Sequence, residues 1–242
     1  MEWRVIKYAE YDAAFNMAID EAILENCMCG GCAPTIRFYG WKQPSITIGR
    51  LQRDYKAPYG WSGSIVRRPT GGRAVYHGSD LTFSVVVEAE LLGSPIAESY
   101  RIVGEAAAEA LRSLGVPAEF IRRRTPSASM RGIDDCFKLS TEYELEAGGI
   151  KVLGSAQMRR AGYVLQQNSL APAAGIDWPP KEKIADAITY ALSKKIGADF
   201  RPANFLPNEM TRAEELVRIK YGCDEWNAHC INPENMTKAQ VE

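Results

Sequence analysis

The sequence predicts an α+β fold, with a mixed, largely antiparallel β-sheet and flanking helices. Short runs of β-branched and aromatic residues recur between turn residues, and longer stretches have helical periodicity. Regular alternation of one strand with one helix, which is typical of Rossmann-type folds, is missing. The chain has 242 residues, of which 46% are hydrophobic. That is enough for one domain over 1–242, in which the polar end at 231–242 is expected to be a loose tail.

The first half of the chain predicts one helix and five strands. Residues 13–26 have the apolar periodicity of a helix, and Asp12 directly before them is a candidate N-cap. The two strands that flank "PTGG" are expected to pair with each other across this turn. The last strand is the strongest, because its β-branched and aromatic residues alternate between two faces. The predicted strands are 35–41, 45–49, 63–68, 74–77 and 80–88.

The second half predicts a long helix at 96–114, which Gly115 and Pro117 end. The stretch "EYELEAGGIKVLGSAQ" (142–157) predicts a β-hairpin, because its Gly-Gly turn supplies positive φ angles without strain. The remaining predicted elements are strands at 118–123 and 162–171 and helices at 181–195 and 207–221.

Composition excludes several classes of protein. The 29 basic and 30 acidic residues nearly cancel, so a uniformly basic surface for nucleic acid is not expected. No apolar run reaches the ~18 residues of a membrane span, and the N-terminus lacks the apolar core of a signal peptide. We therefore expect a cytoplasmic protein with no nucleic acid and no membrane among its partners.

The six cysteines are too few for a disulfide scaffold in a chain of this length, and we expect them to remain thiols. Cys29 and Cys32 have the spacing of metal ligands in "CMCGGC", but a structural zinc site needs a second pair. Cys223 and Cys230 are too far apart in the sequence to supply it. We expect no metal there, and a helix end followed by a glycine-rich turn. The alternative is a non-catalytic thiol or metal module that also includes Cys27.

The stretch "RRPTGGRAVYH" (67–77) can form a cradle for a ligand. Gly71 and Gly72 let backbone amides approach a ligand with no Cβ in the way, and three arginines and His77 crowd the same stretch. The alternative is a tight turn with exposed arginines. A nucleotide is not required, because the sequence has neither a Walker pattern nor G-x-G-x-x-G.

Cys136 and Lys151 are the candidates for covalent chemistry. A free thiol is only about 3% thiolate at neutral pH, so a nucleophilic cysteine needs a nearby cation or dipole. Cys136 follows a stretch at 122–135 that is expected to form a loop. The alternative is that Cys136 is a small structural residue and not a nucleophile. Lys151 follows the Gly-Gly turn. It either points inward, with a pKa depressed by burial, or faces water from an edge strand.

Several stretches together resemble the superfamily of lipoate-protein ligases, biotin ligases and octanoyltransferases. They are "FYGW…SITIG", "RRPTGGRAVYH…DLTFS" and "GIKVLGSAQMRR", within roughly residues 3–170, and "KYGCDEWN" near the C-terminus is also similar. The "CF" shortly before "YELEAGGIKVLGSAQ" resembles LipM-type octanoyltransferases, which use a cysteine in this loop. ATP-dependent lipoate ligases generally carry the lysine without needing that thiol. The resemblance implies a biotin/lipoate-ligase-like fold and octanoyltransferase activity.

This resemblance implies that Cys136 accepts the acyl group and that Lys151 is the active-site lysine. The implied donor is octanoyl acyl carrier protein. The implied acceptor is a lysine of a lipoyl carrier domain, such as glycine-cleavage H protein or the acyltransferase subunit of a 2-oxoacid dehydrogenase. The implied substrate-binding residues are Arg67, Arg68, Gly71, Gly72, Arg73, Val75, His77, Val152, Gly154, Ser155, Ala156 and Gln157.

No cofactor is implied for such a transferase. ATP with Mg²⁺ belongs only to the alternative of an ATP-dependent lipoate-protein ligase, which forms a lipoyl-adenylate. A further alternative is an octanoyl amidotransferase between lipoyl carriers. Two departures from the family's pattern fall within these motifs. His77 is followed by Gly-Ser-Asp where relatives often have an acid at once, and Gln167 and Asn168 stand where relatives commonly have His-Gly.

Overall fold

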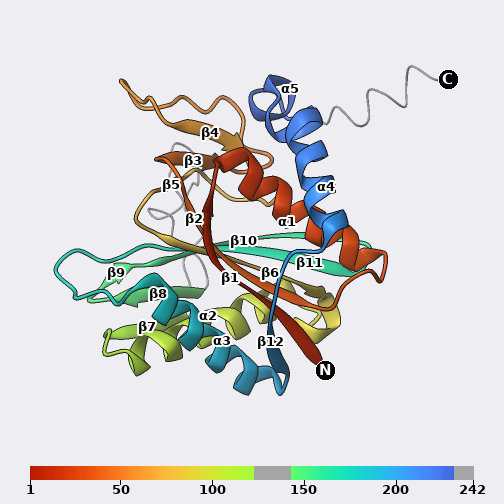
Figure 1. Cartoon of the computed structure of the whole chain (residues 1–242). Helices are drawn as coiled ribbons and strands as arrows, with labels where there is room; N and C mark the ends of the chain where they lie inside the picture. The colour runs from red at the N-terminus through yellow and green to blue at the C-terminus, as the bar shows by residue number, and fades with distance from the viewer. Residues whose placement is uncertain (123–142, 232–242) are drawn as a thin grey trace.

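The computed structural model of the chain describes residues 1–122 and 143–231 (Figure 1). Cys136 and nearly all of the predicted loop at 122–135 and of the predicted tail at 231–242 lie outside the described residues. In the described part, no helix is long and apolar enough to cross a membrane.

The largest element of the fold is a six-stranded sheet. Antiparallel pairs join β10 to β11, β11 to β6 and β6 to β2, whereas β1 runs parallel to both β2 and β12. The predicted mixed, largely antiparallel sheet is therefore confirmed. In sheet order the strands are β10 (Leu153–Arg160), β11 (Tyr163–Leu170), β6 (Leu81–Glu88), β2 (Thr35–Trp41), β1 (Glu2–Tyr11) and β12 (Asp199–Ala203).

A three-stranded sheet corrects one prediction. Here β3 (Ser45–Ile48) lies between β4 (Ser64–Arg67) and β5 (Val75–His77), parallel to the first and antiparallel to the second. The predicted pairing of 63–68 with 74–77 is thus wrong. Because β3 is buried along its whole length, its backbone polar groups need partners on both edges, and the two other strands supply them.

The predicted Gly-Gly hairpin is confirmed in part, in a second small sheet, because its second strand ends at Lys151 instead of continuing to Gln157. This sheet contains β7 (Ala118–Arg122), β8 (Tyr143–Ala147) and β9 (Ile150–Lys151), in that order. Gly148 and Gly149 both have positive φ angles, of 58° and 77°, as the tight turn between β8 and β9 requires. The chain then leaves this sheet and enters the large one through β10.

Helices cover both faces of the large sheet (Figure 1). Helices α1 (Ala13–Met28) and α4 (Pro207–Leu216) pack together on one face, and α2 (Ile96–Ser113) and α3 (Lys181–Ile196) pack together on the other. These confirm the four predicted helices, although the last one continues as a π-helix (Val217–Tyr221). The short elements are a 3-10 turn (Ala89–Leu92) and α5 (Asp224–Asn227).

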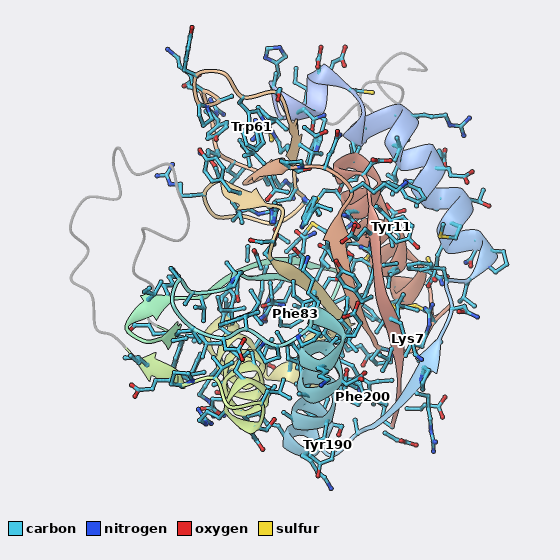
Figure 2. All side chains as sticks on the ribbon, turned by 60° about the vertical axis from the view of Figure 1, so that its left-hand side comes forward. Lys7, Tyr11, Trp61, Phe83, Tyr190 and Phe200 are labelled. Atoms are coloured by element: carbon cyan, nitrogen blue, oxygen red, sulfur yellow. A yellow bond between two sulfur atoms is a disulfide. The ribbon has the colours of Figure 1, made fainter. Side chains whose placement is uncertain are left out.

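The central strand β6 contributes to the cores on both faces. Phe83 is fully buried among side chains of α2 and α3, and Figure 2 shows it near the centre of the molecule. Val86 faces the other way and belongs to the cluster around α1. This alternation holds the two helical layers at a fixed distance from one sheet, so that pockets at the sheet's end have rigid walls.

The cysteine prediction needs a second correction. Cys27 and Cys32 are joined by a disulfide, with their Cα atoms 4.8 Å apart. Helix α1 ends between them, and the glycine-rich turn that follows brings Cys32 back beside the helix end. The predicted helix end and turn are confirmed, but this pair of cysteines does not remain as thiols. Among the described residues, Cys29, Cys223 and Cys230 are free.

Candidate functional site

Two hollows meet at the start of β10. The first, here called the inner pocket, lies between the β3–β5 sheet and the large sheet. The centre of a water molecule can occupy only about 30 Å³ of it. Six of the predicted substrate-binding residues line it, and they are Arg68, Val75, His77, Gly154, Ser155 and Ala156. Its other walls come from Met17, Tyr39, Trp41, Thr47, Thr82, Gln167, Asn168 and Ser169.

His77 is held from three sides in the wall of the inner pocket. Its Nδ1 lies 2.7 Å from Asp80 Oδ2, and its Nε2 lies 2.8 Å from Thr47 Oγ1. The Trp41 ring stacks on the imidazole, with 4.0 Å between the ring centroids. Nδ1 donates to the carboxylate, and Nε2 accepts from the Thr47 hydroxyl in the neutral ring or donates to it in the protonated ring. In both states the imidazole is fixed in position.

Asp80, which is not among the residues predicted for the site, supports His77 from behind the pocket wall. It is buried, and it accepts hydrogen bonds from the Gly78 amide and from the Thr82 and Ser169 hydroxyls besides the one from His77. Burial alone would raise the pKa of Asp80, but the charge and hydrogen bond of His77 and the other donors hold it well below its usual range. The carboxylate therefore stays ionised beside the pocket. The sequence could have indicated this contact, because Asp80 follows His77 by only three residues and can reach back to its ring.

Arg68 braces the Gly-Gly turn from inside. Its guanidinium donates to the carbonyl oxygens of Gly71, Arg73 and Thr47, at 2.5 to 3.1 Å. Gly72 has a φ of 88°, and a Cβ there would come within 2.8 Å of the Arg68 guanidinium. The stretch thus forms a turn held by its own arginine, and the exposed-arginine alternative does not describe Arg68, which is buried.

Arg67 is placed differently. Its side chain is buried, and its guanidinium donates to the carbonyl oxygens of Gly49, Gln52 and Trp226, among others. It is not among the residues that line either hollow. The role that this geometry indicates for Arg67 is to tie the β3–β5 sheet to the C-terminal segment around α5.

A buried polar network supports the inner pocket from the α1 side. The Asp20 carboxylate accepts hydrogen bonds from Arg37, Tyr39, Ser84 and Gln167, at 2.7 to 2.9 Å. Gln167 in turn accepts from the Thr70 hydroxyl at 2.8 Å. Its carboxamide is therefore fixed in the pocket wall.

The second departure, Asn168, also lies in the pocket wall. Its Oδ1 accepts hydrogen bonds from the Ser155 hydroxyl and from Gln166, both at 2.8 Å. Gln157 donates to Gln166 at 2.7 Å, so the predicted residue Gln157 belongs to the same row of amides without lining either hollow. The sequence could have indicated Gln167 and Asn168 as residues of the site, because polar residues are unusual in the middle of a buried strand.

The second hollow, here called the outer cavity, lies on the α2 side of β10 and has a volume of about 400 Å³ by the same measure. Lys151 and Ser155 line it, and Ser155 lines both hollows. Its walls are completed by Ile96, Ala97, Tyr100, Gly104, Phe120, Tyr143, Leu145 and Leu153.

Lys151 is half-buried at the edge of this cavity, opposite Glu146 in the β8–β9 pairing. Its neighbours Ile150 and Val152 differ sharply, because Ile150 is 46% exposed and Val152 is fully buried in the core. Strand β9 ends at Lys151. Lys151 lines the outer cavity together with Ser155, which also lines the inner pocket.

The remaining predicted site residues are located as follows. Gly71 and Arg73 lie half-buried in the turn that Arg68 holds. Cys136 lies outside the described residues. Within residues 1–122 and 143–231, no group of three or more histidine, cysteine, aspartate or glutamate side chains is placed to hold a metal ion.

Comparisons with known proteins show what this chain is similar to. The family model of the lipoyl protein ligase A/B catalytic domain matches residues 12–231. Octanoyltransferase LipM of Symbiobacterium thermophilum is 34% identical, over 93% of this chain and 97% of its own. The protein of the same name from Carboxydothermus hydrogenoformans is 36% identical over the same shares. A solved structure of lipoate-protein ligase A bound with ATP superposes with a TM-score of 0.79 at 25% identity, over 96% of this chain and all of the other.

Proposed function

The chain belongs to the lipoyl protein ligase A/B catalytic domain family, and we propose that it is an octanoyltransferase that acts in lipoate biosynthesis. One observation carries the proposal. Relatives that are named octanoyltransferases share about a third of their residues with this chain over nearly the full length of both. These relatives identify this protein as an enzyme of the acyltransferase class. The proposed acceptor is the lysine of a lipoyl carrier domain.

The proposed donor is the octanoyl thioester of acyl carrier protein, and the proposed nucleophile is Cys136. Its thiolate attacks the thioester carbonyl, a new C–S bond forms, and the C–S bond to the carrier breaks to release the carrier thiol after it takes up a proton. The acceptor lysine's neutral amine then attacks the acyl-enzyme. An amide forms, the amine loses a proton, and the Cys136 thiol is regenerated. No ATP is needed, because the thioester is already activated.

The inner pocket is the proposed site of the octanoyl chain. The lining of this pocket includes the apolar side chains of Met17, Val75 and Ala156, which suit an alkyl chain. Burial of about seven methylene-sized groups at ~0.8 kcal/mol each contributes about 5–6 kcal/mol to binding. The polar wall at Gln167 and Asn168 is held by hydrogen bonds and does not yield easily to a longer chain.

Lys151 is the proposed electrostatic partner of the reaction. Its position in the wall of the outer cavity supports this role, because Ser155 lines the same cavity and also the inner pocket. An ammonium group there stabilises both a cysteine thiolate and the oxyanion of a tetrahedral intermediate. The amides of the turn at Gly72 are the proposed further donors.

The test is an intact-mass measurement. Purified protein is mixed with octanoyl acyl carrier protein without ATP, and the proposal expects a mass gain of one octanoyl group on Cys136. The Cys136→Ser variant, treated alongside, is expected to gain no thioester and to lose transfer to a lipoyl domain. Full transfer by Cys136→Ser would refute the proposed nucleophile.

An ATP-dependent lipoate-protein ligase is the second candidate, because the solved structure with a TM-score of 0.79 is such a ligase with ATP bound. It would form a lipoyl-adenylate and need Mg²⁺. Incubation with free octanoate, ATP, Mg²⁺ and a lipoyl domain separates the two functions. Modification of the lipoyl domain only when ATP is present would favour the ligase, whereas transfer from the carrier thioester alone favours the transferase.

A further inference from the structure

We propose that the outer cavity binds the pantetheine arm of the acyl donor while the inner pocket holds the acyl chain. This inference rests on the proposed function, in which the donor is a carrier-protein thioester. A pantetheine arm is a narrow, flexible chain with two amide groups that ends in the thioester sulfur. The cavity therefore has to be next to the reacting carbonyl, mostly apolar, and open to the surface where the carrier protein docks.

The position of β10 between the two hollows meets the first requirement. Side chains of a strand alternate between its faces, and Leu153 lines the outer cavity whereas Gly154 and Ala156 line the inner pocket. Ser155 borders both. Among the described strands, β10 stands at the end of the six-stranded sheet, so no strand of that sheet covers its outer edge. A thioester that crosses this edge has its acyl chain on one side and its arm on the other.

The chemistry of the cavity walls meets the second requirement. The rings of Phe120 and Tyr143 stack almost parallel, with 5.7 Å between their centroids, and Leu145 and Leu153 add apolar surface. Gly104 of α2 makes room for this platform, because a Cβ there would clash with the Phe120 ring. Apolar walls suit the methyl and methylene groups of the arm, and the lining hydroxyl groups suit its amides.

The same walls argue against a nucleotide. Among the described residues that line the cavity, Lys151 alone carries a charge. A bound triphosphate is usually held by several donors, including a glycine-rich loop, basic side chains and a metal ion. A neutral arm that is joined to the thioester needs only the single cation, placed at the carbonyl.

Size and access meet the third requirement. The volume of about 400 Å³ falls within the range of about 300–1,000 Å³ that is usual for small-molecule sites. Ile96, in the first turn of α2, lines the cavity and is 54% exposed, so the cavity reaches the surface there. An arm entering past Ile96 passes Tyr100 on its way to Lys151.

The test compares two octanoyl donors that differ only in the arm. Octanoyl pantetheine carries the complete arm, and octanoyl N-acetylcysteamine carries only its thiol end. Transfer to a lipoyl domain is measured as kcat/KM for each donor, and the wild-type protein is expected to prefer the complete arm by about tenfold or more, because a truncated substrate loses remote binding energy. The Ala97→Trp variant fills the cavity and is expected to lower this ratio to about one or two.

Two further variants make the result decisive. Glu109→Trp adds the same bulky side chain to an exposed position of α2, away from the cavity, and is expected to keep the wild-type ratio. Ile96→Trp narrows the surface opening at an exposed position, so it reports on the cavity even if Ala97→Trp fails to fold. It is expected to lower the ratio at least threefold, by weaker binding of the longer arm.

The outcomes separate this inference from the proposed function. A wild-type ratio near one, or an unchanged ratio in both cavity variants, would overturn the binding of the arm in the outer cavity while transfer itself persists. Absence of transfer from either donor, and from octanoyl acyl carrier protein, would instead remove the proposed function.

Discussion

The buried pair of His77 and Asp80 keeps the imidazole in the wall of the inner pocket in a fixed position. The imidazole uses one nitrogen for the carboxylate and the other for Thr47, so it has no freedom to turn. Asp80 comes three residues after His77 instead of directly after it, and the intervening Gly-Ser segment allows the carboxylate to return to the ring. The carboxylate therefore contacts the imidazole although it does not follow His77 directly.

The Asp80→Asn variant tests the stability that this pair contributes. The native pKa of Asp80 lies below its value in the unfolded chain, about 3.9, so its stabilisation is present above that pH and is lost as the pH falls. Hydrogen bonds to a charged group contribute about 1.5–3 kcal/mol each, and we expect Asp80→Asn to lower the free energy of unfolding by about that amount at pH 7. Urea unfolding from pH 7 to pH 3 is the measurement. The gap between the two proteins should shrink below pH ~4, and a constant gap would contradict the assignment.

A prediction for Lys151 concerns chemistry rather than stability. Lys151→Ala removes the cation from the wall of the outer cavity, and we expect kcat/KM for octanoyl transfer to fall by about 10²-fold or more, with little change in melting temperature. Lys151→Arg keeps the charge and should recover part of the activity. Lys7, on the outside of β1 (Figure 2), supplies the control, because Lys7→Ala should change neither quantity. Equal activity of Lys151→Ala and wild type would remove Lys151 from the mechanism.

At the scale of elements, the link between β4 and α5 holds the site together over a long sequence distance. The Trp226 indole donates to the Arg67 carbonyl at 2.7 Å, and the Asn227 side chain accepts from the Arg67 amide at 2.8 Å. The guanidinium of Arg67 closes the link by donating to carbonyl oxygens on both sides. The stretch "KYGCDEWN", one of those that resemble the family, thus holds β4 in place through Trp226 and Asn227.

The Arg67→Met variant tests this structural role against the predicted role in substrate binding. It leaves several buried carbonyl oxygens without a donor, and we expect the free energy of unfolding to fall by about 3 kcal/mol or more. Because Arg67 lines neither hollow, KM of the folded variant should stay close to the wild-type value. Arg201→Met, at an exposed position, is the control and should cost less than about 0.5 kcal/mol. A raised KM with unchanged stability would return Arg67 to the substrate site.

Local patterns explain which elements could be predicted from the sequence. The strand β6 and helix α2 carry their own periodicity, and the turn at Gly148 and Gly149 carries its own backbone requirement. Strands β1 and β12 were not predicted, because they pair with each other over almost the whole chain, from Glu2 with Asp199 to Ile6 with Ala203. The partner of β4 was mistaken for the same reason, since no local signal shows that β3 lies between β4 and β5.

For the candidate site too, local patterns predicted some residues, whereas others are brought to it only by the tertiary fold. The stretch 67–77 was identified because its glycines, arginines and histidine are contiguous, and the structure brings Arg68, Val75 and His77 to one pocket. Trp41 and Thr47 could not be assigned to it, because only the tertiary fold places these two strand residues against the histidine. The outer cavity was not foreseeable at all, since it forms between a helix and two separate sheets.

At the scale of the whole molecule, α1 connects the two ends of the chain to the site. One turn of the helix carries two buried carboxylates that face different ways. Asp20 pairs with Arg37 beneath the inner pocket, and Glu21 pairs with Lys220 of the π-helix near the C-terminus. A displacement of α1 would therefore move the pocket wall and the C-terminal segment together.

The pair of Glu21 and Lys220 allows this connection to be measured. Lys220 Nζ donates to both carboxylate oxygens of Glu21, at 2.8 and 2.7 Å, and the Tyr221 hydroxyl donates to the same group at 2.6 Å. Both side chains are about 95% buried, so Lys220→Met leaves an uncompensated charge, which we expect to cost about 3–5 kcal/mol in urea unfolding. Glu21→Gln combined with Lys220→Met removes that charge and should recover at least half of the loss. Lys194→Met, at an exposed position of α3, should cost less than about 0.5 kcal/mol. If Lys220→Met costs as little as this control, or if the double variant is as unstable as the two single variants added together, the buried pair does not couple α1 to the C-terminal segment.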